Sequence, residues 1–251
     1  MHARLLRLLA LAAACWLSPA ARAGEVVVSA AASLTQALRD LVPLYEAAHP
    51  GDRVLLNFGA SGALLAQIAK GAPADVFVSA DQESMDQAQD RGLVRPAQRR
   101  DMVSNSLVVI VPAAATRAPR ALADLAGPDF GRIAIGLPAS VPVGRYTRGV
   151  LEAADLWRAI EPKMIGAHHV RQALDYVARG EVDAGFVYAT DAAVLPGKVR
   201  VAFTVPTARP IRYPVAPLAA APNAAEAVRF VDFLFTPGAQ AVLVRHGFGK
   251  P

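Results

Sequence analysis

Two serines stand where a strand-like apolar run meets a helical pattern. Ser33 follows the run from Val26 to Val28, and Ser61 follows the run from Arg53 to Phe58. A helix N-terminus presents unpaired N–H groups and about half a positive charge, so it attracts anions without a lysine or arginine. At these strand-to-helix junctions, the serine hydroxyls and the free N–H groups could therefore donate hydrogen bonds to an anion. Ordinary N-capping is the alternative, and Gln36, three residues after Ser33, fits a capping box.

Other segments repeat this arrangement with main-chain donors or a phenol. Val143 lies in "VPVG", just before a helical pattern and after a strand, and Val170 opens the helical pattern "VRQALDYV". Tyr188 ends the strand-like run "AGFVY", and a buried tyrosine hydroxyl needs a polar partner, which an oxyanion would supply. An ordinary turn remains the alternative at Val143, because proline is common in the first helical turn.

The chain lacks the motifs of several common enzyme classes. It has no P-loop, H-E-x-x-H, G-x-S-x-G or G-x-G-x-x-G motif. His168 and His169 are adjacent, so on a regular element they would face different ways, and we expect a solvated loop pair. Asp75 and Asp81 bracket a strand and would lie roughly 20 Å apart, too far for a general acid–base pair. With no nucleophile beside a base, the sequence does not indicate an enzyme.

The elements that position these residues alternate between strands and helices. This alternation predicts an α/β fold with largely parallel sheets. Leu34, Leu38, Leu41 and Tyr45 recur at helical spacing, as do Leu64, Leu65 and Ile68. Further helices are predicted over 85–91, 144–153, 170–179 and 224–234. The predicted strands are 26–29, 53–58, 76–79, 106–111, 132–136, 184–187 and 199–203.

Two extended segments indicate a chain that crosses between two lobes. The first is "NSLVVIVP", from Asn105 to Pro112. The second runs from about Val205 to Pro217, and its four prolines make it a poor helix or central strand. We therefore predict two lobes with a cleft between them, the first formed by 24–106 plus 215–251 and the second by 107–214, where hinge motion costs little.

The N-terminal residues 1–23 are typical of a secretory signal peptide. They combine a basic start, an apolar stretch of about a dozen residues and the small-x-small signal Ala21-Arg22-Ala23. Cleavage after Ala23 would remove Cys15, the only cysteine, and would lower the excess of basic over acidic residues from five to two. "LAAAC" loosely resembles a lipoprotein processing site, so a lipid anchor at Cys15 is the alternative. The charges are scattered, which does not indicate nucleic-acid binding.

Five blocks of the sequence are distinctive when taken together: "AAASLTQAL", "GASGALLAQIAKGAPADVFVSADQESMDQA", "NSLVVIVP", "VPVGRYTRGVL" and "GEVDAGFVYATDA". They resemble the molybdate-binding proteins of bacterial ABC transporters, a family of periplasmic solute-binding proteins, and the similarity extends to His246-Gly247-Phe248. The resemblance covers essentially the whole chain after residue 23. It implies a two-lobed type II fold, in which two crossing strands join the lobes and molybdate or tungstate lies in the cleft.

The resemblance also implies which groups hold the anion. Carried over by motif, the hydroxyls come from Ser33, Ser61 and Tyr188, and the backbone amides from Val143 and Val170. No residue would coordinate the metal atom directly, and no cofactor is implied. The family often has alanine at the position of Val143 and a second serine at the position of Gly62. The first change leaves the amide in place, and the second removes a possible hydroxyl.

The resemblance further implies a periplasmic protein, expected to be a monomer, that delivers its anion to an ABC permease in the inner membrane. A site of neutral donors avoids burying a counter-charge, which would cost several kcal/mol in desolvation. It also disfavours protonated anions such as phosphate, whose O–H needs an acceptor. A receptor for sulfate or another tetrahedral oxyanion is the first alternative, and an enzyme on the same fold is the second.

Overall fold

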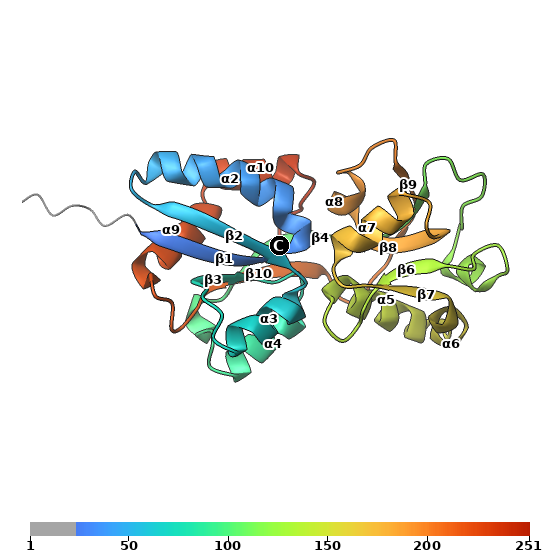
Figure 1. Cartoon of the computed structure of the whole chain (residues 1–251), viewed down its shortest axis with the longest axis horizontal. Helices are drawn as coiled ribbons and strands as arrows, with labels where there is room; N and C mark the ends of the chain where they lie inside the picture. Colours follow the sequence, from blue (N-terminus) through green and yellow to red (C-terminus); the bar gives the residue numbers. More distant parts are fainter. Residues whose placement is uncertain (1–23) are drawn as a thin grey trace, which may run out of the picture.

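The computed structural model describes residues 24–251 and shows two lobes side by side (Figure 1). The predicted signal peptide and Cys15 lie outside the described residues. The first lobe contains a five-stranded sheet in the order β2-β1-β3-β10-β4. Its strands are β1 (Glu25–Ala31), β2 (Arg53–Gly59), β3 (Val76–Val78), β4 (Arg100–Asn105) and β10 (Ile211–Pro217).

The second lobe contains a sheet of the same size in the order β7-β6-β8-β5-β9. Both sheets are mixed, because the strands next to the crossings run antiparallel to their neighbours: β10 to β3 and β4, and β5 to β8 and β9. The prediction of largely parallel sheets therefore holds only away from the crossings. The strands are β5 (Leu107–Pro112), β6 (Ile133–Gly136), β7 (Met164–Ala167), β8 (Ala184–Tyr188) and β9 (Val199–Val205).

Helices cover the sheets of both lobes, as Figure 1 shows. In the first lobe they are α2 (Thr35–Ala48), α3 (Ser61–Ala69), α4 (Gln82–Asp90), α9 (Ala224–Leu234) and α10 (Pro237–Arg245). In the second they are α5 (Pro142–Ala153), α6 (Trp157–Ile160), α7 (Val170–Ala178) and α8 (Ala189–Ala192). Short 3-10 turns are η1 (Ala32–Leu34), η2 (Pro96–Gln98), η3 (Leu122–Ala126) and η4 (Glu161–Lys163).

The apolar periodicity of the sequence corresponds to buried helix faces. Leu34, Leu38, Leu41 and Tyr45 are all fully buried, as the predicted helix required. The Tyr45 hydroxyl donates to Asp52 at 2.7 Å, so this buried phenol keeps a polar partner. Among residues 24–251, no single helix is long and apolar enough to cross a bilayer, and only α9 and α10 together meet that test, as a pair bent by 63°.

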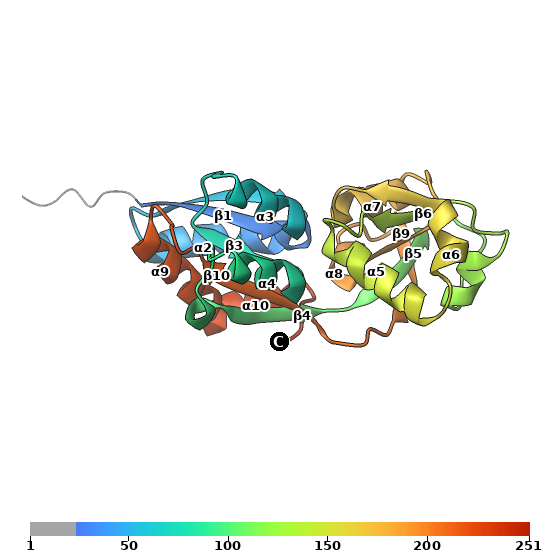
Figure 2. The same ribbon diagram turned by 90° about the horizontal axis from the view of Figure 1, so that it is seen from below.

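The chain passes between the lobes twice, and both passages are shorter than predicted (Figure 2). Only Ser106 separates β4 from β5, and only residues 206–210 separate β9 from β10. The expectation that the second segment makes a poor central strand is wrong, because β10 lies between β3 and β4. The sheet accepts Pro214 because the register shifts between Tyr213 and Pro214. Residues 211–214, predicted for the second lobe, thus pair within the first sheet.

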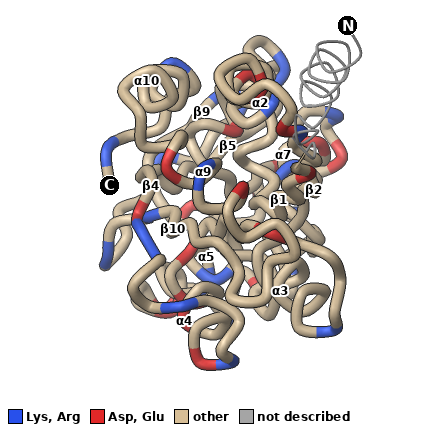
Figure 3. The backbone as a smooth tube through the Cα atoms, turned by 90° about the vertical axis from the view of Figure 1, so that its left-hand side faces the viewer, with Lys and Arg blue, Asp and Glu red and all other residues tan. Residues whose placement is uncertain are grey.

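Charged residues of both signs are interspersed along the backbone at the end of the first lobe (Figure 3). Many of them pair with each other, as Arg229 does with Asp52 and Glu226, and Arg100 with Asp232. The Arg100–Asp232 pair is exposed on both sides and therefore contributes little to stability.

Candidate functional site

The five residues predicted to hold an anion line one cavity between the lobes. Ser33 comes from η1 and Ser61 from the start of α3, both in the first lobe. The second lobe contributes the N-termini of α5 and α7 and the end of β8, with Val143, Val170 and Tyr188. The cavity is small, with a volume of about 10 Å³. Ser61 and Tyr188 are 0% and 1% exposed, so an anion can reach them only when the lobes separate.

The two serines do not cap their own helices. Ser33 lies inside η1, whose N-cap is Ala31, and the next helix is capped by Leu34 without a side-chain bond. Ser61 is the first residue of α3 and follows the N-cap Ala60, again without a side-chain bond. The alternative of ordinary N-capping, including the capping box with Gln36, is therefore wrong, and both hydroxyls are available for other partners.

The Ser33 hydroxyl is positioned by a hydrogen-bonded chain that runs through Tyr213 to Asn105. Its Oγ lies 3.0 Å from the hydroxyl of Tyr213, and Asn105 Nδ2 donates to that same hydroxyl at 3.2 Å. Because Asn105 fills an acceptor position of Tyr213, the phenol proton can go to Ser33 and leave the Ser33 proton for an anion. Burial raises the pKa of Tyr213 well above its usual range, so the phenol stays neutral. Phe248, at the end of the chain, packs edge-on against its ring.

The Ser61 hydroxyl is oriented by the main chain of Ala80. The Ala80 N–H donates to Ser61 Oγ at 3.0 Å, which leaves the serine proton free to point into the cavity. The carbonyl of Ala80 accepts from the Tyr188 hydroxyl at 3.5 Å, a long bond between the lobes. Burial also raises the pKa of Tyr188 well above its usual range, so it remains a donor at neutral pH.

The backbone N–H groups of Val143 and Val170 lack an acceptor within residues 24–251. Both belong to the first turns of helices, where such groups have no partner within the helix. Gly144 brings the start of α5 against the end of β6, because a Cβ there would lie 1.9 Å from the carbonyl oxygen of Gly136. The glycine in "VPVG" thus allows the close contact between α5 and β6 that positions the Val143 amide at the cavity.

Arg171, next to Val170, connects several of these elements. Its Nε lies 2.6 Å from Asp191 Oδ1, and its Nη2 donates across the cleft to the carbonyl of Ser33 at 3.1 Å. Asp191 is fully buried, and its other oxygen accepts from the Tyr188 N–H at 3.3 Å. Burial raises the pKa of Asp191 to about 6, against the opposing effect of Arg171. Both residues lie behind the cavity rather than in its wall.

The residues that line the cavity carry no charged side chain. His169, predicted to be a solvated loop residue, is instead the half-buried N-cap of α7, and its Nδ1 accepts from the Gln172 N–H at 3.1 Å. His168 is exposed as expected. Asp75 accepts from the Val27 and Asn223 amides, whereas Asp81 caps α4. Within the described residues, no group of three or more His, Cys, Asp or Glu side chains is placed to hold a metal ion.

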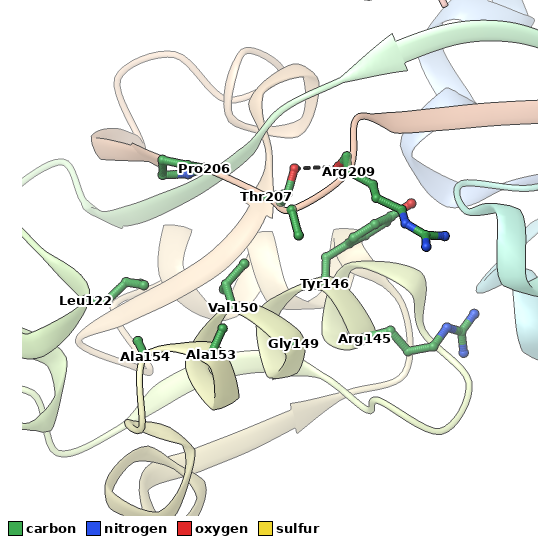
Figure 4. A pocket seen from close by; sticks show the side chains of 11 residues that line it. Leu122, Arg145, Tyr146, Gly149, Val150, Ala153, Ala154, Pro206, Thr207 and Arg209 are labelled. Atoms are coloured by element: carbon green, nitrogen blue, oxygen red, sulfur yellow. Dashed lines mark hydrogen bonds between the residues drawn. The ribbon is translucent and has the colours of Figure 1, made fainter.

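A larger hollow lies elsewhere, between α5 and the second crossing (Figure 4). It has a volume of about 460 Å³, and apolar side chains such as Leu122 and Val150 form much of its wall together with Pro206. None of the five predicted residues lines it. The hydroxyl and amide donors are therefore concentrated in the small cavity between the lobes.

No local sequence pattern indicates the residues that support the cavity wall. Tyr213 is separated from Ser33 by 180 residues, and Asn105 from Tyr213 by 108. Tyr213 also belongs to the proline-marked segment that was expected to be a crossing. Only the pairing of β10 with β4, which sets Ile211 opposite Asn105, brings these groups together.

Comparison with known proteins finds relatives over most of the chain. The family model for bacterial extracellular solute-binding proteins matches residues 26–249. The chain is 36% identical to the molybdate-binding protein ModA of Escherichia coli, over 90% of this chain and 89% of that protein. It is 33% identical to ModA of Haemophilus influenzae, over 91% of each chain.

Solved structures show the same fold. The periplasmic molybdate-binding protein of Azotobacter vinelandii superposes with a TM-score of 0.78 at 28% identity, over 90% of this chain and 99% of that one. The sulfate-binding protein SubI of Mycobacterium tuberculosis superposes with a TM-score of 0.81 over 90% of this chain and 86% of that one, but at 19% identity it supports the fold alone. The chain therefore belongs to the family of bacterial extracellular solute-binding proteins.

Proposed function

We propose that this protein binds molybdate, and tungstate in the same way, in the cavity between its lobes. The observation that carries the proposal is the convergence of three hydroxyls and two unpaired amides, from both lobes, on a cavity without charged side chains. The names of the relatives from Escherichia coli and Haemophilus influenzae agree with this ligand. Ser33, Ser61 and Tyr188 would donate through hydroxyls, and Val143 and Val170 through amides.

The proposed site suits a fully deprotonated tetrahedral anion. Its oxygens need only donors, and each donor would form a charge-assisted bond. Phosphate carries a proton near neutral pH, and the cavity lining offers that proton no carboxylate. Sulfate has the same charge and the same donor requirements as molybdate, so the size of the closed cavity would have to separate the two.

The same proposal covers the cellular role. The protein would act in the periplasm as a monomer, after removal of residues 1–23, and would pass the anion to an inner-membrane ABC permease. It would bind its ligand without changing it and without a cofactor. The first lobe would comprise residues 24–106 and 211–251, and the second lobe residues 107–210. This boundary differs from the predicted one because the whole of β10 is assigned to the first lobe.

Isothermal titration with molybdate, tungstate, sulfate and phosphate tests the proposed ligand. We expect tight binding of the first two and much weaker binding of the others. Tight binding of sulfate with no heat from molybdate would overturn the proposal. Competition by tungstate in a molybdate titration would show that both anions use one site.

A further inference from the structure

Arg145 extends from one lobe to the other at the edge of the cavity. It lies on α5, two residues after Val143, and it also lines the apolar hollow, where Figure 4 shows its guanidinium directed toward the first lobe. Its Nε donates to Asp81 Oδ2 at 2.8 Å, and its Nη2 lies 2.6 Å from the same oxygen. Nη2 also donates to Ser84 Oγ at 2.7 Å. Asp81 and Ser84 belong to the N-terminus of α4 in the first lobe.

Asp81 is held in position to receive this arginine. Its Oδ1 accepts from the Ser84 N–H at 3.1 Å and from the Ser79 hydroxyl at 3.0 Å. The remaining oxygen, Oδ2, faces Arg145. The Asp81 side chain is 5% exposed and that of Arg145 is 15% exposed, so little solvent screens the pair. A pair so far removed from water attracts more strongly than an exposed one.

Beside this pair, the loop before α5 also contacts the start of α3 in the other lobe. Arg145 Nη1 donates to the carbonyl of Pro138 at 3.3 Å, in the loop before α5. In the same loop, the Ser140 carbonyl accepts from the Gly62 N–H of α3 at 3.0 Å. A Cβ on Gly62 would lie 2.8 Å from that carbonyl oxygen, so only glycine allows this approach without a shift of the main chain.

We infer that Arg145 is a closing residue, whose pair with Asp81 holds the lobes together over the bound anion and so slows its release. This inference rests on the proposed function. The pair can form only when α5 and α4 meet, and separation of the lobes returns both charges to water. Arg145 does not line the cavity, so it acts on the lobes and not on the anion. Asp81 and Glu83, whose Oε2 lies 3.5 Å from Arg145 Nε, offset its charge, so the contact adds no unpaired cation beside the anion.

Molybdate release can test this role. Protein loaded with radiolabelled molybdate is chased with excess unlabelled molybdate, for the parent, Arg145→Gln, Asp81→Asn and the double variant. Asparagine keeps an oxygen that can cap α4. The matched control is Arg148→Gln on the same helix, because Arg148 pairs with Glu152 of its own lobe.

We expect release to be about tenfold faster in either single variant, the size of a typical coupling between close charges. The association rate should change little, and the double variant should be no faster than the singles. Added salt should speed release from the parent more than from Arg145→Gln. The control should match the parent, and the melting temperatures of the ligand-free proteins should agree.

Two results would overturn the inference in distinguishable ways. If the parent binds molybdate but all variants release it at the parental rate, or the single effects add in the double variant, Arg145 has no closing role and the proposed function stands. If the parent binds neither molybdate nor tungstate, the proposed function fails and the inference fails with it.

Discussion

At the scale of single residues, the serines are the donors whose removal should cost most. Neither hydroxyl caps a helix, so Ser33→Ala and Ser61→Ala leave the helix ends intact. Each should weaken molybdate binding by about 1.5 to 3 kcal/mol, the range for a hydrogen bond to a charged group. Val143→Ala keeps the proposed amide donor and serves as the matched control. Titration of the three variants beside the parent gives the values, and normal binding by the serine variants would refute their assignment.

Tyr213 should matter without touching the anion. Tyr213→Phe keeps the ring against Phe248 and removes only the hydroxyl that contacts Ser33 and Asn105. The Ser33 hydroxyl then loses the group that orients it, so molybdate binding should weaken, but by less than in Ser33→Ala. In the double variant the loss should equal that of Ser33→Ala alone, because both changes act through one hydroxyl. Additive losses in a titration series would show that Tyr213 acts elsewhere.

At the scale of elements, the N-cap of α7 should make stability depend on pH. Burial lowers the pKa of His169 from 6.5, with Arg171 and His168 acting in the same direction and Asp175 against it. The unfolded chain therefore binds a proton more readily than the folded one. The stabilising contribution of neutral His169 is complete above about pH 6.5 and is lost as the pH falls from there toward the folded pKa.

His169→Asn isolates this contribution, because asparagine is a good N-cap that does not titrate. Denaturant unfolding at about pH 7.5 and about pH 5.5 should show that the parent loses more stability on acidification than the variant does. Asp191, whose pKa is raised to about 6, titrates in both proteins and cancels in this comparison. Equal losses in the two proteins would contradict the assigned role of His169.

The elements also show what sequence patterns can and cannot predict. Strands and helices with strong periodicity, such as α2 and β1, lie where their apolar residues predict them. The sequence did not predict β4, β7 or β10. β10 carries Pro214 and Pro217, which usually exclude a central strand, and the register shift that accommodates Pro214 depends on its partner β4. Likewise, the Ser33 capping pattern is real in sequence, but η1 intervenes before α2.

Among the cavity residues, the sequence indicates the donors to the anion but not the groups that orient them. Strand-to-helix corners point to Ser33, Ser61, Val143 and Val170 because helix ends always carry free N–H groups. The groups that orient their hydroxyls come from distant parts of the chain, and nothing local marks them. Arg145 could not be assigned a partner from sequence either, because its contact with Asp81 depends on how the two lobes meet.

At the scale of the whole molecule, the burial of the donors requires the lobes to move. Ser33, Ser61 and Tyr188 are at most 3% exposed, so an anion reaches their hydroxyls only when the lobes separate. The passages at Ser106 and at residues 206–210 are the places where such motion would occur. X-ray scattering should give a larger radius of gyration for the ligand-free protein than with saturating molybdate. Superimposable scattering curves would contradict the predicted closure.

The proposed function places a molybdenum oxyanion between the lobes, held by neutral donors alone. The most direct test is an anomalous difference map at the molybdenum absorption edge, from crystals grown with molybdate. We predict one strong peak between the lobes, with its oxygens within about 2.7 to 3.2 Å of the Ser33, Ser61 and Tyr188 hydroxyls and of the Val143 and Val170 amides. A peak in the hollow beside α5, or an arginine, lysine or histidine side chain in contact with the anion, would contradict the claim.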